Sequence, residues 1–186
     1  KHAAERAALG IPPLPLNPEQ VTALVFFLRN PPKGEETFLM ELLTDRVPPG
    51  VDESARIKAD FLGGVASGKD KSPLISRQKA TELLGTMLGG YNVRILISLL
   101  GDPAVGSAAA ESLKKTILVF NAIKDVQALA AKGNANAKAV LKSWAEGEWF
   151  TSRPDLPKSI KLAVFKVNGE TNTGDFSPDP DANTRP

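Results

Sequence analysis

Short stripes of apolar residues at helical spacing, separated by proline, glycine and helix-capping residues, fill the first 150 residues of this chain. Residues three and four positions apart lie on the same side of a helix, so each stripe predicts one apolar helix face. An apolar face is stable in water only when a neighbouring element covers it. The sequence therefore predicts several short helices packed on one another.

The first complete helix signal begins at Asn17. Asn17 is a favourable N-cap, Pro18 suits the first helical position, and Gln20 lies three residues after the cap, as in a capping box. A stripe follows, and Pro31-Pro32 ends the helix; the stripe consists of Val21, Leu24, Val25 and Leu28.

Seven further segments repeat this pattern, with Asp52, Ser76, Asn92 and Asp102-Pro103 as predicted helix starts. The stripes, in chain order, are Phe38, Leu39, Leu42 and Leu43; Ile57, Phe61, Leu62 and Val65; Leu83, Leu84, Met87 and Leu88; Val93, Leu96, Ile97 and Leu100; Leu113, Ile117 and Phe120; Val126 and Leu129; and Val140, Leu141, Trp144 and Trp149.

Eight or nine helices with short links predict antiparallel helical hairpins, each of which needs a neighbour to cover its apolar face. We therefore expect a mostly α fold, a HEAT-like stack of helical hairpins over residues 1–155. The sequence contains no strict repeat, so spacing alone supports this prediction, and a closed helical bundle is the alternative.

The character of the sequence changes after residue 155. Residues 160–167 are rich in β-branched and aromatic residues and predict a strand, and residues 169–186 are rich in turn-forming residues. A single strand cannot form a stable sheet. Residues 156–186 are therefore expected to be a linker and the start of a truncated α/β domain. The chain begins with Lys1 and ends at Pro186 in a loop-like stretch, so we expect residues to be missing at both ends.

The composition excludes several classes of site. The chain has no cysteine, so disulfides, thiolate catalysis and Cys-bound zinc or iron–sulfur clusters are excluded within these residues. The absence of cysteine fits a reducing compartment, and we expect a cytoplasmic protein. The apolar runs are too short to span a membrane, and the net charge of +2 does not indicate a nucleic-acid surface.

Four motifs resemble functional sites, and each has a simpler interpretation. Residues 63–70 nearly match a phosphate-binding loop, but Asp70 replaces the hydroxyl residue and the segment follows a helix, so we interpret it as a helix end and turn. His2, the only histidine, is expected to be solvated, and the aspartates of residues 175–181 do not have EF-hand spacing. The aromatic residues from Trp144 to Phe150 are expected to seal a core or a domain junction rather than form a binding platform.

Three strings carry a family resemblance: residues 46–53 (RVPPGVDE), residues 82–92 (ELLGTMLGGYN) and residues 165–173 (FKVNGETNT). They resemble the N-terminal part of the bacterial B-type aconitases, the family also called bifunctional aconitate hydratase 2 / 2-methylisocitrate dehydratase. The resemblance extends from Lys1 to Pro186 without obvious gaps.

The resemblance implies that residues 1–155 are the HEAT-like domain of these enzymes and that residues 156–186 begin their swivel domain. It implies a parent hydro-lyase that interconverts citrate and isocitrate through cis-aconitate, and also acts on 2-methylisocitrate, with a [4Fe-4S] cluster whose ligands lie outside this chain. The family's Ser-Arg-Pro element reads Thr184-Arg185-Pro186 here, and it implies that Arg185 binds a substrate carboxylate. Gly174, Asp179 and Asn183 depart from the family pattern.

The fragment itself is expected to be inactive, to shape access to the active site and to contact other proteins or a second copy of itself. The alternative comes from a different functional class. It is a stand-alone helical-repeat module that binds other molecules, RNA among them, and has no enzymatic parent. Lysine and arginine are scattered along the chain, which favours solvated helix faces over an RNA-binding groove.

Overall fold

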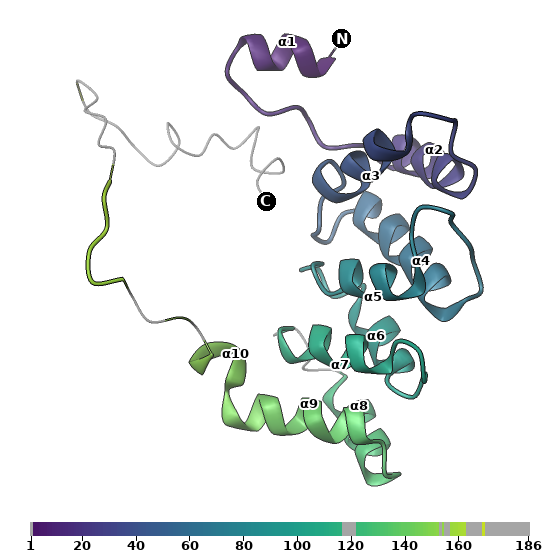
Figure 1. Ribbon diagram of the computed structural model, residues 1–186, viewed down its shortest axis with the longest axis vertical. Coiled ribbons are helices and arrows are strands. Elements are labelled where there is room, and N and C mark those ends of the chain that lie inside the picture. Colours follow the sequence, from purple (N-terminus) through teal and green to yellow (C-terminus); the bar gives the residue numbers. More distant parts are fainter. Residues whose placement is uncertain (1, 117–121, 153, 155–156, 163–168, 170–186) are drawn as a thin grey trace.

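The computed structural model describes residues 2–116, 122–152, 154, 157–162 and 169. Within these ranges the chain forms ten α-helices and no strand (Figure 1). The helices are α1 His2–Ala8, α2 Pro18–Arg29, α3 Glu36–Asp45, α4 Glu53–Ser67, α5 Arg77–Leu84, α6 Val93–Leu99, α7 Gly106–Lys114, α8 Ile123–Ala131, α9 Ala135–Glu146 and α10 Glu148–Thr151. The prediction of a mostly helical chain is confirmed.

Side-chain caps begin α2, α4 and α5 where the sequence predicted them. Asn17 Oδ1 accepts a hydrogen bond from the Gln20 backbone N–H at 2.9 Å, and Gln20 Oε1 accepts one from the Asn17 N–H at 3.0 Å. Asp52 Oδ1 accepts a hydrogen bond from the Ala55 N–H at 3.1 Å. Ser76 Oγ accepts one from the Lys79 N–H, also at 3.1 Å. These caps satisfy backbone donors that the first turn of a helix otherwise leaves without a partner.

Helices α2 to α9 follow one another along the long axis of the molecule (Figure 1). Chain neighbours pack as the pairs α2 with α3, α4 with α5, α6 with α7 and α8 with α9. Contacts between these pairs join α2 to α4 and α4 to α6 on one side, and α5 to α7 and α7 to α9 on the other. Each pair thus covers the apolar faces of the pairs before and after it.

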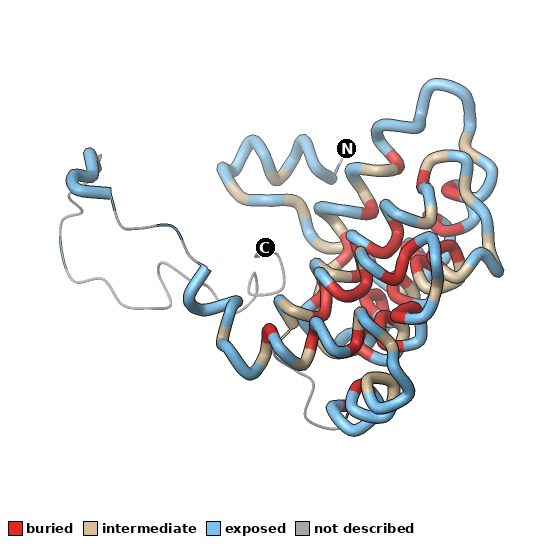
Figure 2. Tube along the Cα trace, turned by 60° about the horizontal axis from the view of Figure 1, so that its bottom comes forward, coloured by how far each residue is buried: buried red, intermediate tan, exposed pale blue. Residues whose placement is uncertain are grey.

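The core is one continuous apolar cluster that extends from α2 to α9 (Figure 2). The predicted stripes of α2 and of residues 93–100 are buried completely: Val21, Leu24, Val25, Leu28, Val93, Leu96, Ile97 and Leu100. Helices α1 and α10 bury none of their residues. Three residues of the predicted stripes, Phe38, Leu88 and Trp149, are exposed instead.

Two predicted helix boundaries differ from the structure, and one predicted cap makes no capping bond. Asn92 precedes α6 as predicted, but its side-chain amide donates to the Leu84 and Met87 carbonyls instead of capping the helix. The helix expected from Asp102 begins only at Gly106, after a turn in which Asp102 accepts the Ala104 N–H at 2.8 Å. The last predicted helix is divided at Gly147, whose φ of +62° ends α9.

The predicted strand over residues 160–167 lies mostly outside the described residues. Its first three residues, 160–162, are described and are not in a strand. Ile117 and Phe120, which the sequence assigned to a helix, also lie outside the described residues.

Candidate functional site

Arg185, the one predicted substrate-binding residue, lies outside the described residues, as do the aspartates of residues 175–181. His2 is described, and its Nε2 accepts a hydrogen bond from the Leu14 backbone N–H at 3.2 Å on an exposed surface. In the described part of the chain, no three histidine, cysteine, aspartate or glutamate side chains cluster as metal ligands would. No helix there is long and apolar enough to cross a bilayer.

The segment that resembles a phosphate-binding loop forms the end of α4, which confirms the interpretation as a helix end and turn. Gly63 and Gly64 lie inside the helix, and Gly68 ends it with a φ of +77°. Asp70 accepts a hydrogen bond from Arg29 Nε at 2.9 Å, and this bond lowers the pKa of the Asp70 carboxyl. A negative charge held at this position would repel a phosphate.

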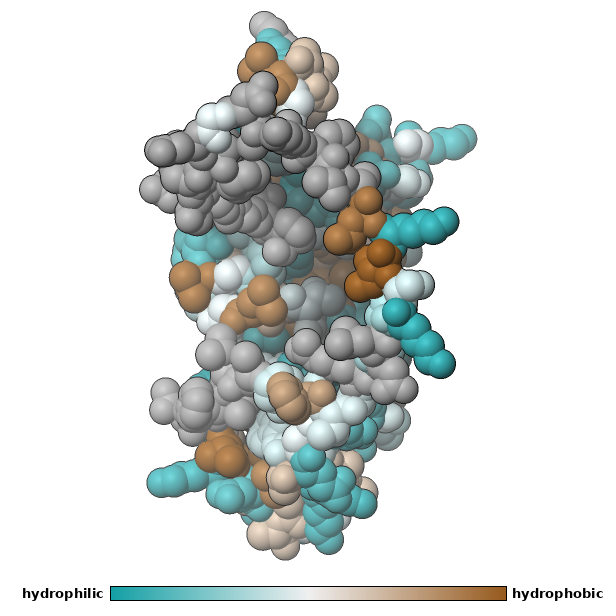
Figure 3. Space-filling model, turned by 90° about the vertical axis from the view of Figure 1, so that its left-hand side faces the viewer, coloured by the Kyte–Doolittle hydropathy of each residue, from teal (hydrophilic) through white to brown (hydrophobic). Residues whose placement is uncertain are grey.

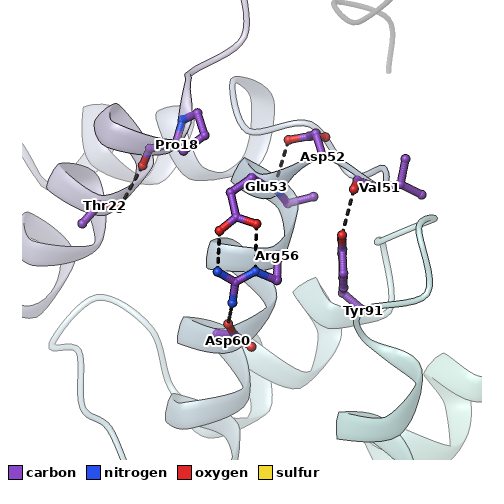
Figure 4. A network of polar contacts seen from close by, with 9 residues as sticks. Pro18, Thr22, Val51, Asp52, Glu53, Arg56, Asp60 and Tyr91 are labelled. Carbon is purple, nitrogen blue, oxygen red and sulfur yellow. Dashed lines mark hydrogen bonds and ion pairs between the residues drawn. The ribbon is translucent and has the colours of Figure 1, made fainter.

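Arg56 occupies the centre of a polar network on the exposed side of α4 (Figure 4). Its Nε donates to Glu53 Oε2 at 2.9 Å and its Nη1 donates to Asp60 Oδ2 at 2.9 Å. The hydrogen bonds from Arg56 lower the pKa of the Glu53 carboxyl. These groups are three and four residues apart and solvated, so the network is a helix-surface ion pair rather than an acid–base centre.

Two of the strings that carry the family resemblance meet beside this network. The backbone N–H of Leu88 donates to the Pro49 carbonyl at 2.8 Å, and the Tyr91 hydroxyl donates to the Val51 carbonyl at 2.8 Å (Figure 4). Gly89 lies so close to the Gly50 carbonyl that a side chain at that position would overlap it. The two loops therefore form a closely fitted contact between the turn after α3 and the turn after α5.

Lys58 is the only charged side chain among the buried residues of the described chain, with 2% of its surface exposed. It projects from the buried face of α4 and makes no ion pair or hydrogen bond in the described part of the chain. Burial lowers its pKa to about 8, and the negative charge of Asp45 opposes this effect. A lysine with such a pKa is a candidate nucleophile or base, but it lines none of the grooves described below.

Two larger grooves are open to solvent. The first, of about 410 Å³, lies between α2 and α3 and is almost entirely apolar, with Phe27 and Phe38 among its lining residues. The second, of about 420 Å³, lies between α6 and α8, where Arg94, Asp125 and Lys132 surround an apolar floor. A third, smaller groove of about 320 Å³ lies between α2 and α4 beside Arg56. None of the three grooves is lined by a histidine or a cysteine, so they contain no Ser–His or Cys–His pair.

The three aromatic residues singled out in the sequence have different environments. Trp144 packs against the core, and its Nε1 donates to the Leu113 carbonyl at 3.0 Å. Trp149 and Phe150 lie on α10 and are 41% and 66% exposed. The interpretation as a core seal is confirmed for Trp144.

Known proteins match this chain over its whole length. Residues 1–150 match the family described as the aconitate B N-terminal domain. The chain is 58% identical to aconitate hydratase B of Pseudomonas aeruginosa, 55% identical to that of Escherichia coli and 49% identical to that of Helicobacter pylori. Each alignment covers 100% of this chain but only 21% or 22% of the relative. The chain thus spans about a fifth of the length of these relatives, and it belongs to the family of aconitate B N-terminal domains.

Proposed function

We propose that this chain is the N-terminal helical part of an aconitate hydratase, with residues 1–155 as a HEAT-like domain and residues 156–186 as the start of the swivel domain. The observation that carries the proposal is the 49–58% identity to aconitate hydratase B over the entire chain. The pairwise contacts from α2 to α9 support a HEAT-like arrangement, in which each hairpin packs mainly on its neighbours.

The parent enzyme would convert citrate to isocitrate through cis-aconitate, and 2-methylisocitrate would be a second substrate. A [4Fe-4S] cluster would supply the Lewis acid of that reaction. This chain does not fit such a cluster, because it contains no cysteine to bind the irons. The cluster ligands would therefore lie on the remainder of the longer chain. The helical domain would shape the access of substrate to the active site.

The stand-alone interaction module, including its RNA-binding version, gains no support from the described residues. Several described cations pair with carboxylates, such as Arg29 with Asp70 and Arg77 with Asp102. Such pairing leaves fewer free cations to bind phosphates.

The test is to express the gene that continues this reading frame and to measure conversion of citrate to isocitrate after reconstitution of the cluster. We expect turnover by the longer protein and none by the purified 186-residue chain. A longer protein that binds a full cluster and yet shows no turnover would contradict the proposal.

Arg185 provides a second test of the same proposal. The guanidinium can engage both oxygens of a substrate carboxylate, whereas a lysine offers a single point donor. One charge-assisted hydrogen bond is worth about 1.5–3 kcal/mol, so Arg185→Lys is expected to lower kcat/KM about tenfold or more. Thr184→Ser is the matched control and should leave kcat/KM unchanged. Unaltered kinetics in both Arg185→Lys and Arg185→Ala, at equal cluster content, would exclude Arg185 from substrate binding.

A further inference from the structure

Helix α10 presents an aromatic pair to solvent. The rings of Trp149 and Phe150 contact each other edge to face, with centroids 5.6 Å apart and an interplanar angle of 69°. Helix α10 buries none of its own residues. Two adjacent large aromatic residues that remain exposed in the described chain are typical of a surface that another domain or protein covers.

The turn at Gly147 separates this pair from the core. Gly147 adopts a left-handed conformation with a φ of +62°, which favours glycine because it has no side chain. Before the turn, Trp144 is held against the core; after it, α10 contacts mainly α9 (Figure 1). Without this turn, a continuous helix would place Trp149 elsewhere around the α9 axis. The backbone therefore directs the aromatic pair away from the helical core.

The position of α10 in the chain indicates which part of a longer protein would cover the aromatic pair. The relatives are about five times as long as this chain, so a large part of such an enzyme follows α10. Ten residue steps separate Phe150 from Ile160, and a chain of that length spans at most about 36 Å. A domain that begins near residue 160 would therefore start within that distance of the aromatic pair. Ile160 and Leu162, at alternate positions, are 65% and 77% exposed and also lack a partner among the described residues.

We propose that Trp149 and Phe150 form the surface on which the helical domain docks against the domain that begins near residue 160 and continues beyond residue 186. The occupant is an apolar surface of that following domain. Apolar side chains also reach the surface elsewhere on the side where α10 lies (Figure 3). This proposal rests on the proposed function, because it requires the longer parent chain.

A second pair of residues provides a matched control at the other end of the array. Phe26 and Phe27 on α2 are also in edge-to-face contact, with centroids 5.6 Å apart and an angle of 75°. They are 60% and 42% exposed, much like Phe150 and Trp149. The two pairs therefore have similar chemistry and similar access to solvent in the 186-residue chain.

Hydroxyl-radical footprinting with mass spectrometry tests the proposal in the full-length protein and in the 186-residue chain. We expect the oxidation rate of Trp149 and Phe150 to fall at least fivefold in the full-length protein, and that of Phe26 and Phe27 to change less than twofold. Equal rates for Trp149 and Phe150 in the two proteins would overturn the proposal. A fall at both pairs, or protection that disappears on dilution and so comes from a second copy, would also overturn it.

Substitution provides an independent measurement. In the full-length protein, Trp149→Ala with Phe150→Ala should increase the rate of protease cleavage between residues 152 and 159 at least tenfold, and Phe26→Ala with Phe27→Ala should not. Equal cleavage rates in the two double variants would contradict docking at α10. Neither readout requires enzyme activity. An inactive full-length protein with a protected Trp149 would refute the proposed function alone, and an active one with an exposed Trp149 would refute the docking alone.

Discussion

Replacing Lys58 with methionine should stabilise the protein. The lysine is 2% exposed and makes no ion pair or hydrogen bond in the described part of the chain, so its ammonium group has lost most of its contact with water without gaining a partner. Methionine has a similar length, no charge and a flexible chain that fits irregular spaces. Lys58→Met therefore removes the desolvated charge and leaves most of the packing of α4 intact.

The magnitude follows from the pKa of the lysine. Burial lowers the pKa of Lys58 from 10.5 to about 8, and a change of one in pKa corresponds to about 1.4 kcal/mol. At pH 7 the charged lysine thus lowers the free energy of unfolding by about 3 kcal/mol. Imperfect packing of the new side chain would offset part of the gain. We expect Lys58→Met to raise the free energy of unfolding by about 1–3 kcal/mol at pH 7.

The pH dependence provides a sharper test. Below pH 8 Lys58 is charged in both the folded and the unfolded state, and the destabilisation is complete. Between pH 8 and 10.5 the unfolded chain binds more protons than the folded chain, so stability rises with pH. Urea unfolding of the parent protein should therefore show a gain of about 2 kcal/mol from this group between pH 7 and pH 9.5. The Lys58→Met variant should lose that gain.

Lys79→Met is the matched control, because Lys79 is an exposed lysine on α5. It should change the free energy of unfolding by less than about 0.5 kcal/mol at either pH. If Lys58→Met destabilised the protein at pH 7, or if the difference between variant and parent were the same at pH 7 and pH 9.5, the reasoning from a desolvated charge would be refuted.

Three further substitutions test individual contacts by urea unfolding. Asn92→Asp should destabilise the protein more than Asn92→Ala does. The buried amide donates to two backbone carbonyls, at 2.7 and 3.2 Å, that a carboxylate would repel. The reverse order would show that the amide is not needed as a donor. Gly89→Ala should lower the free energy of unfolding by about 1–3 kcal/mol, because the new side chain would overlap the Gly50 carbonyl. Gly101→Ala, where the new side chain would make only an ordinary contact, is the control and should not have this effect. Equal effects would mean that the loops separate easily. Trp144→Phe should remove the 3.0 Å hydrogen bond of the indole and about 1 kcal/mol of stability; an unchanged free energy of unfolding would mean that water replaces the bond.

Local sequence signals predicted the helix starts that depend on local hydrogen bonds. Asn17, Asp52 and Ser76 cap helices within three residues of themselves, so the sequence alone contains all the partners. Asn92 has the same residue type, but its side chain bonds to the carbonyls of Leu84 and Met87. Tertiary packing determines whether an asparagine caps its own helix or bonds to carbonyls outside that helix, and no local sequence pattern distinguishes the two cases.

The division of the last helix was missed for a related reason. A single glycine within a helical pattern is compatible with a continuous helix, so the stripe from Val140 to Trp149 predicted one element. The structure divides it at Gly147 and thereby gives Trp144 and Trp149 different environments. Arg185, by contrast, lies outside the described residues, and its role at a substrate site stays a prediction.

The strings around residues 46–53 and 82–92 include two loops that lie between helices. They meet in space, where Gly89 approaches Gly50 and Tyr91 bonds to Val51. A backbone approach of this kind tolerates few substitutions. The two strings that carry the family resemblance in this part of the chain therefore meet at a contact between helical pairs.

The contacts between successive helical pairs also affect how the protein is made. Helices α2 to α5 are complete before residue 90 and bury much of their apolar surface on one another, while α6 and α7 cover the remaining side of α4 and α5. During synthesis the chain leaves the ribosome at about 5–20 residues per second, and local contacts form much faster than that. Each helical pair can therefore fold as it emerges and provide a template for the next. In a longer polypeptide the array would be assembled before translation of the catalytic region is complete.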